Sequence, residues 1–283
     1  SKSLGTGIDP LDVIADHGAD AVRYGLLKMS STQDVRFSYD AVREGRKLAN
    51  KLWNVSRLLL TNAKTAPAAR PRDVEERWIL ARIDQVRGEV EERFAELDFV
   101  GAVNGLYHLT FDDFCDWYAE AIKPRLYEQD EDAGATALAA LERLLKLLHP
   151  VMPHVTEEIW AQLPEHRERL IVSPWPAPDG AQSGDAGAVD RAQEAAAIFR
   201  RSGVLVELEG DARRIFEAVV RPRSAGGDGD VGVEKERLLK EIGRAQEMLA
   251  NDRFLANAPS EVVEGEREKL ARYQRELDAL GGA

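Results

Sequence analysis

The sequence is poor in cysteine and has no long hydrophobic run. Cys115 is the only cysteine among 283 residues, which excludes an internal disulfide framework and a cysteine-based zinc site. A single free thiol fits a reducing cytoplasm. No apolar stretch reaches the roughly 20 residues that a membrane-spanning helix needs, and we find no signal-peptide pattern. We therefore expect a cytoplasmic globular protein with no membrane partner.

Basic residues are also in deficit. The chain has 38 Lys and Arg against 50 Asp and Glu, a net charge of −12. A general nucleic-acid coat protein carries a basic surface, so this balance argues against that class. Any nucleic-acid binding must come from local positive faces on an acidic body. The apolar fraction of 44% supports a real core, while 31% charged residues are typical of long, solvated helices.

Helix signals are present from the start of the chain. Asp9 is a good N-cap, Pro10 suits the first helical position, and Gly18 can end the helix in a left-handed conformation. A second short helix is expected over 19–29. Residues 35–37 are a candidate short strand.

The middle of the chain predicts an antiparallel helical bundle. Apolar residues recur at helical spacing over residues 39–63, which predicts one long helix. Short connections between several such helices are typical of a bundle. Further helices are expected at 74–97, 100–127, 134–148 and 154–163.

The rear of the chain predicts two smaller parts. Residues 177–189 are rich in Gly, Ala, Ser and Asp and predict a linker. A small α/β unit is expected next, with helices at 191–201 and 212–220 and a strand at 204–208. Residues 223–232 hold many glycines and predict a flexible segment.

A coiled-coil hairpin is expected at the carboxyl end. Two apolar series step by three and four residues and are joined by a turn at 257–260, as in an antiparallel coiled coil. The series are Leu238, Ile242, Ala245 and Leu249, then Val263, Glu266, Leu270, Tyr273, Leu277 and Leu280. The fold class is therefore mainly α: a bundle, a small α/β linker unit and the hairpin.

His149 and His154 flank a break made by two prolines. Neither carboxylate nor cysteine spacing completes a metal site around them. We expect capping or packing roles for both histidines and no metal.

Several motifs together resemble class I aminoacyl-tRNA synthetases. Residues 1–5, Ser-Lys-Ser-Leu-Gly, resemble the end of the Lys-Met-Ser-Lys-Ser loop, and 17–24 resemble the stretch that trails it. Residues 50–54, Asn-Lys-Leu-Trp-Asn, with Arg57 match the first helix of the anticodon-binding domain. Its later helices are matched by Asp116-Trp117-Tyr118, Glu120, Lys123, 149–154 and 156–160.

The valine branch of that family fits best. Residues 31–37, Ser-Thr-Gln-Asp-Val-Arg-Phe, resemble it, as do 249–251 with Phe254 in a terminal coiled coil. An isoleucine enzyme is expected to end in a cysteine-rich zinc module. The alternatives left open are an isoleucyl or leucyl enzyme fragment, a free-standing RNA-binding module, and a structural protein whose coiled coil pairs with another chain.

The resemblance implies a division into four parts. These are the end of a catalytic domain at 1–38, an anticodon-binding bundle at 39–177, a connector at 190–221 and a coiled-coil tRNA-binding arm at 232–283. The sequence does not begin with Met, and we expect the nucleotide-binding fold and editing domain of the parent enzyme to lie upstream. The chain alone is then expected to be a monomer that binds tRNA but does not aminoacylate it.

Lys2 is the one candidate catalytic residue. It matches the second lysine of the signature loop, which implies contact with ATP phosphates and stabilisation of the leaving pyrophosphate. The alternative is a frayed terminal lysine. The parent enzyme is implied to use ATP with Mg²⁺ and to join valine to tRNA(Val), whereas this chain is expected to hold no cofactor by itself.

The candidate RNA contacts lie on two surfaces. Unpaired anticodon bases stack on aromatic or guanidinium planes, which favours a polar-aromatic helix face. The alternative is that Trp53 belongs to the core and that the Asn residues satisfy buried helix ends. The face comprises Arg46, Asn50, Lys51, Trp53, Asn54 and Arg57.

On the coiled coil, basic side chains are expected to contact tRNA phosphates. The alternative is a solvated surface of mixed salt bridges, since acidic residues are slightly more numerous there. The resemblance favours RNA contact. The residues are Arg237, Lys240, Arg244, Arg267 and Arg272, with Lys269 and Arg275 beside them.

Overall fold

The computed structural model describes residues 8–29, 37–165, 168–178, 180, 186–220, 231–251, 254 and 260–281. The chain divides into two compact units, residues 1–185 and 186–283. The predicted contacts of Lys2, most of the candidate strand at 35–37, the glycine-rich stretch at 223–230 and most of the turn at 257–260 lie outside the described residues.

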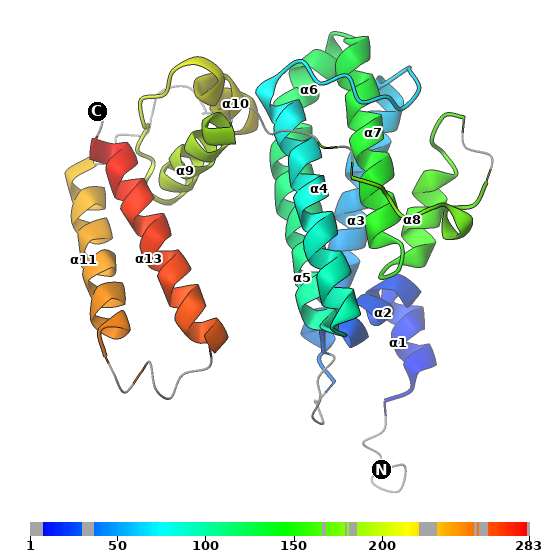
Figure 1. Ribbon diagram of the computed structural model, residues 1–283, viewed down its shortest axis with the longest axis horizontal. Coiled ribbons are helices and arrows are strands. Elements are labelled where there is room, and N and C mark those ends of the chain that lie inside the picture. Colours follow the sequence, from blue (N-terminus) through cyan, green and yellow to red (C-terminus); the bar gives the residue numbers. More distant parts are fainter. Residues whose placement is uncertain are drawn as a thin grey trace, which may run out of the picture. The chain divides into compact units, whose positions relative to one another are not determined.

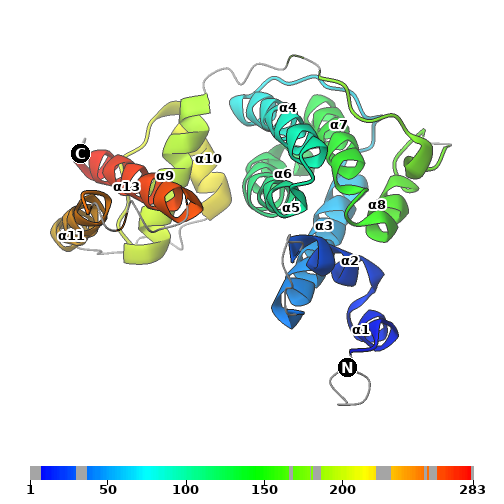
Figure 2. The ribbon, with the colours of Figure 1, turned by 60° about the horizontal axis from the view of Figure 1, so that its bottom comes forward.

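The first unit is a bundle of long helices with shorter helices packed at one end (Figures 1 and 2). Its long helices lie side by side and bury an aliphatic core in which Leu48, Leu52 and Ile79 have no exposed surface. The elements are α1 (Pro10–His17), α2 (Ala19–Lys28), α3 (Tyr39–Asn62), α4 (Val74–Ala95), α5 (Phe99–His108), η2 (Leu109–Tyr118), α6 (Ala119–Tyr127), α7 (Glu131–Leu148), α8 (Pro153–Trp160) and η3 (Leu170–Val172).

The predicted ends of the first helix are confirmed. The Asp9 carboxylate accepts a hydrogen bond from the Leu11 amide at 2.9 Å, and Pro10 opens α1. Gly18 ends it at φ 89°, a conformation that glycine adopts without steric cost. The two short helices therefore begin and end where the capping residues indicated.

The helix predicted over 100–127 is continuous but not uniform. Its middle third, η2, is a π-helical segment, in which each turn holds about one residue more than an α-helix. This widening buries the rings of Phe114 and Tyr118 completely. The spacing of apolar residues did not predict this π-helical segment, because such a segment changes the phase of the buried face without interrupting the helix.

Two glycines let α2 lie directly against α3. A Cβ on Gly25 would meet Val42 at 2.8 Å, and one on Gly45 would meet the Tyr24 ring at 2.8 Å. Because neither glycine has a side chain, the backbones of α2 and α3 can approach each other closely. Tyr24 is fully buried in this contact and donates a hydrogen bond to Glu44 at 2.7 Å.

The second unit consists, in its described residues, of four helices: α9 (Ala186–Ser202), α10 (Gly210–Val220), α11 (Val231–Leu249) and α13 (Ser260–Gly281). The rings of Phe199 and Phe216 meet edge to face between α9 and α10. The α/β connector was therefore predicted wrongly. No strand occurs in the described parts of the chain, and residues 204–208 connect α9 and α10 without regular secondary structure.

The cause of this error lies in the alternation of residues 204–206. Val204 is buried and Val206 is half-buried against α9, α11 and α13, whereas Leu205 is half exposed. This is the period of two that a strand produces. A strand also needs a partner for its backbone hydrogen bonds, and helices surround this segment instead.

The coiled-coil seam is confirmed. All the described seam positions are buried or half-buried, and α11 pairs with α13. One buried position was not anticipated: Glu276 of α13 is 2% exposed and pairs with Arg201 of α9 at 3.0 Å. This ion pair ties the root of the hairpin to the preceding helices. No helix in the described residues is long and apolar enough to cross a membrane.

Candidate nucleic-acid interface

Helix α3 has one buried and one exposed side. Ser38 caps it by accepting a hydrogen bond from the Ala41 amide at 3.5 Å. Steps of three and four residues place Val42, Leu48 and Leu59 in the bundle core, where they are fully buried. The opposite side faces solvent along the whole helix.

The exposed side of α3 is basic, amidic and aromatic. No Asp or Glu is among its exposed residues between positions 43 and 61. Arg43 pairs with Asp40 one turn earlier, and Arg57 has no ion-pair partner within the described part of the chain. We call this side the α3 face; it comprises Arg43, Arg46, Lys47, Asn50, Trp53, Asn54, Arg57 and Thr61.

Five of the six predicted contact residues on this helix lie on the α3 face. The alternative placing Trp53 in the core is wrong, because its side chain is 37% exposed. Lys51 differs from the other five. Its ammonium group lies 2.6 Å from Asp116 and over the Phe111 ring, so it contacts η2 rather than facing solvent.

Arg46 connects the α3 face with the first two helices. Its guanidinium donates a hydrogen bond to the carbonyl oxygen of Asp16 at 3.0 Å. Beside it lies a hollow of about 330 Å³, which includes Asn50 and the amino-terminal turn of α2. The hollow is lined by His17, Gly18, Ala19, Asp20, Ala21, Arg46, Ala49, Asn50 and His154.

A second hollow lies farther along the same face, between α3 and the end of α8. It also measures about 330 Å³. We call it the α3–α8 groove; it is lined by Trp53, Ser56, Arg57, Leu60, Thr61, Ile159 and Gln162. Sequence reasoning did not find Ser56, Ile159 or Gln162. The signal for Ser56 was present, since it is a hydroxyl in phase with the apolar positions 52 and 59.

Helix α2 anchors the turn between α7 and α8. The Asp20 carboxylate is buried and accepts hydrogen bonds from the amides of His154 at 3.0 Å and Val155 at 2.6 Å, capping α8 from a distant part of the chain. Arg23 donates two hydrogen bonds to the Pro150 carbonyl oxygen, at 3.0 and 3.1 Å. The α3 face and the α8 end of the groove are therefore held by one set of contacts.

His149 lies in the same turn and makes the packing contact expected of it. Its Nδ1 is 2.8 Å from the Thr156 hydroxyl, which itself donates to the Met152 carbonyl oxygen. Nδ1 must then carry the hydrogen. Burial lowers the pKa of His149 below its ordinary 6.5. No cluster of His, Cys, Asp or Glu suitable for a metal occurs in the described residues.

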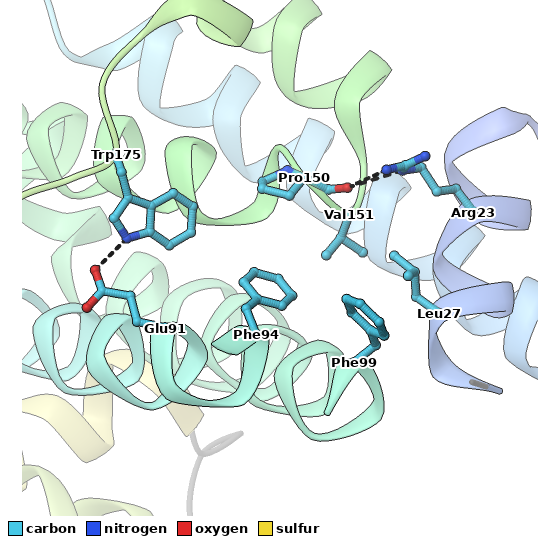
Figure 3. Close-up of a pocket in the computed structure, with 8 residues that line it drawn as sticks. All are labelled: Arg23, Leu27, Glu91, Phe94, Phe99, Pro150, Val151 and Trp175. Carbon is cyan, nitrogen blue, oxygen red and sulfur yellow. Dashed lines mark hydrogen bonds between the residues drawn. The ribbon is translucent and has the colours of Figure 1, made fainter. Parts of the chain in front are cut away.

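A third hollow of the first unit is apolar (Figure 3). It measures about 530 Å³, and the rings of Phe94, Phe99 and Trp175 line it. Its polar groups are already bonded: Glu91 accepts from the Trp175 indole at 2.7 Å, and Arg23 donates to Pro150. This hollow therefore offers aromatic surface but few free hydrogen-bonding groups.

Cys115 is buried in η2 and unpaired. Burial raises the pKa of its thiol to about 12. The thiol is therefore protonated at neutral pH and is a small core group.

The basic residues of the hairpin are mostly exposed, but several pair with neighbours on the same helix. Arg244 lies 2.8 Å from Glu241, and Arg267 lies 3.3 Å from Glu264. Arg272 lies over the Tyr273 ring at 5.0 Å. Surface pairs of this kind are weak and can exchange for phosphate partners. The arrangement is thus compatible with both interpretations of the hairpin surface.

Comparisons with known proteins identify the family. A model of the "anticodon-binding domain of tRNA ligase" matches residues 76–213, and one of the "valyl tRNA synthetase tRNA binding arm" matches 233–283. The valine–tRNA ligase of Carboxydothermus hydrogenoformans is 33% identical over 99% of this chain, and that of Mycobacterium tuberculosis H37Rv is 34% identical over 99%. The chain belongs to the valyl-tRNA synthetase family.

The match is to part of these ligases. The chain spans about two fifths of the curated relatives, 39% of the Carboxydothermus protein and 38% of the Mycobacterium one. Its two matched regions are the anticodon-binding domain and the tRNA-binding arm, at the carboxyl end of the family's chains. The predicted valine branch is therefore confirmed over the leucine and isoleucine branches.

A solved structure resembles part of the fold. The LeuRS chain in a ternary complex with tRNA and LeuAMS, from Agrobacterium radiobacter K84, matches 64% of this chain and 22% of its own length with a TM-score of 0.51. At 23% identity this likeness concerns the fold alone.

Proposed function

We propose that this chain is the tRNA-binding part of a valine–tRNA ligase. In this proposal the bundle binds the anticodon of tRNA(Val), and the coiled-coil hairpin binds the body of the same tRNA. The single observation that carries the proposal is the α3 face, which has cations, amides and an exposed indole but no carboxylate on a protein of net charge −12.

The chemistry of the α3 face suits an unpaired RNA loop. Splayed bases stack on exposed rings and guanidinium planes, and amides pair with base edges. Trp53, Arg57 and Asn54 supply these three kinds of group within two turns of one helix. Because α3 is fixed in the bundle by its buried side, the spacing of these three groups along the helix is set before RNA binds.

The ligase reaction belongs to the parent enzyme. There ATP with Mg²⁺ activates valine, and the adenylate esterifies the tRNA end. Lys2 is proposed to contact the ATP phosphates in that enzyme. The four-part division at 1–38, 39–177, 190–221 and 232–283, and a monomeric state, are part of the same proposal.

Substitutions on the α3 face test the anticodon contact. We expect Trp53→Ala to weaken binding of a tRNA(Val) transcript by about five- to a hundredfold, because a base loses its stacking partner. Arg57→Ala should weaken it by about three- to tenfold through a lost phosphate or base contact. Fluorescence anisotropy with labelled transcript measures both.

Arg213→Ala is the matched control for charge. Arg213 is exposed on α10, and its one ion-pair partner among the described residues is Glu217 of the same helix, at 2.8 Å. The Arg213→Ala variant removes the same single charge as Arg57→Ala and should change the affinity for the tRNA(Val) transcript less than twofold. Equal effects of Arg57→Ala and Arg213→Ala would contradict a specific α3 face, since net charge alone would then explain both.

A further inference from the structure

The α3–α8 groove has the size of a site for one small group. Small-molecule pockets measure roughly 300–1,000 Å³, and this groove, at about 330 Å³, is at the lower limit. A helix or strand from a partner would need a longer depression. The groove continues the α3 face, since Trp53 and Arg57 belong to both.

Ser56 provides an unused hydrogen-bonding group in this groove. Its side chain is 1% exposed, and its Oγ has no hydrogen-bond partner within the described part of the chain. A buried hydroxyl without a partner is costly, and folded proteins rarely leave one. Because Ser56 lines the groove, a ligand bound there can supply the missing partner.

The other lining groups define the chemistry of that ligand. Leu60 and Ile159 give apolar surface, and the half-exposed indole of Trp53 offers a plane for stacking. The amide nitrogen of Gln162 donates a long bond of 3.4 Å to Glu158, and its amide oxygen has no partner among the described residues. Arg57, which has no ion-pair partner among the described residues, adds a cation at the same site.

A flat group with a polar edge and an adjacent negative charge fits this combination. A nucleobase stacks on the ring, pairs through its edge with a hydroxyl or amide, and carries a phosphate for the guanidinium. We propose that the α3–α8 groove holds one unpaired base of the bound RNA and that Ser56 pairs with its edge. This inference rests on the proposed function, because it assumes RNA on the α3 face.

Ser56→Ala tests the hydroxyl directly. The variant removes a group with no partner in the free protein, so its resistance to urea should equal or exceed that of the wild type. Its affinity for the anticodon stem-loop of tRNA(Val) should nevertheless fall by roughly three- to tenfold. A loss of binding without a loss of stability is expected only if the ligand supplies the partner.

Thr110→Val is the matched control. Thr110 is a second fully buried residue whose hydroxyl has no partner among the described residues, and it lies on η2 outside the groove. This variant should match Ser56→Ala in stability but keep wild-type affinity for the stem-loop. If both variants lost affinity equally, the effect would be general and the groove proposal would fail.

An abasic scan identifies the base. Stem-loops that lack one base at a time are measured against the wild type and Ser56→Ala. One position should weaken wild-type binding strongly, and Ser56→Ala should cause no further loss there. Salt-sensitive wild-type binding without such coupling at any position would overturn the groove proposal alone. No binding of any stem-loop by the wild type would overturn the proposed function as well.

Discussion

His149 lies in the turn between α7 and α8, and its protonation directly affects that turn. Its Nε2 is buried and has no partner in the described residues, while Nδ1–H is used by Thr156. A proton added at Nε2 would place a charge in a site that cannot solvate it. This is the physical reason that burial lowers the pKa of His149.

The lowered pKa predicts how stability depends on pH. The folded-state pKa lies below the unfolded value of about 6.5, so the unfolded chain binds the proton more readily. The contribution of His149 is therefore complete above pH 6.5 and is lost as pH falls below that value. Urea unfolding at pH 7.5 and 5.5 should show this loss in the wild type.

His149→Asn should reduce that pH dependence. Asparagine keeps a donor near the position of Nδ1 but cannot take up a proton. His108→Asn is the control, because His108 is exposed at the end of α5 and hydrogen-bonds Asp112 at 2.7 Å. If His149→Asn retained the whole pH dependence of the wild type, the buried imidazole would not be its source.

Two helix ends show strain that sequence patterns did not reveal. Leu97 after α4 and Gln129 after α6 both have φ 62°, in the left-handed region. Each helix closes with the paired hydrogen bonds of a Schellman motif, such as Asp98 N to Arg93 O at 2.8 Å and Asp130 N to Arg125 O at 3.0 Å. Glycine normally occupies that position, because a Cβ is strained there.

We therefore expect Leu97→Gly and Gln129→Gly to stabilise the bundle. Relief of the left-handed strain should exceed the added flexibility of the unfolded chain, a net gain of roughly 0.5–1 kcal/mol each. Gln85→Gly, at an exposed position inside α4, should cost about 1 kcal/mol and serves as control. Thermal unfolding of the three variants measures this. A loss of stability in both cap variants would contradict the argument.

The carboxyl end of α6 belongs to a polar cluster in the core. Arg125 of α6 lies 3.0 Å from Glu76 of α4, which has no exposed surface, and 2.9 Å from Asp130. Glu76 also completes the capping box of α4. These contacts join three helix termini at one end of the bundle: the amino ends of α4 and α7 and the carboxyl end of α6.

At the scale of the whole molecule, charge distribution matters more than net charge. The protein is acidic, but its α3 face is locally basic. Contacts to phosphates release counterions, so affinity should fall linearly with salt on logarithmic axes. A chain of net charge −12 should otherwise repel RNA.

The two proposed surfaces should contribute independently, because they lie on separate units of the chain. A hairpin variant with Arg244, Arg267 and Arg272 all changed to Ala should make the salt dependence less steep. A variant that combines these three changes with Arg57→Ala should change log Kd by the sum of the two separate effects. Anisotropy titrations at several salt concentrations test this. Strong non-additivity would mean that one surface does not bind when the other is altered.

Most helices could be predicted because their signals are local. The caps at Asp9 and Gly18, the period of α3 and the seam of the hairpin each depend on residues a few positions apart. The strand at 204–208 was wrong for the same reason: alternation shows which side chains are buried, but not whether a backbone partner exists. Only the folded unit could supply or withhold that partner.

The sequence by itself determined the family, the helical architecture and the composition of the α3 face, because spacing along one helix fixes which residues share a side. The tertiary structure alone decided that Lys51 turns to Asp116, that Asp20 caps α8, and that Ser56 meets Ile159 and Gln162 in one groove. Those contacts join residues from about 65 to about 135 positions apart. They depend on how helices pack, and no local pattern encodes that.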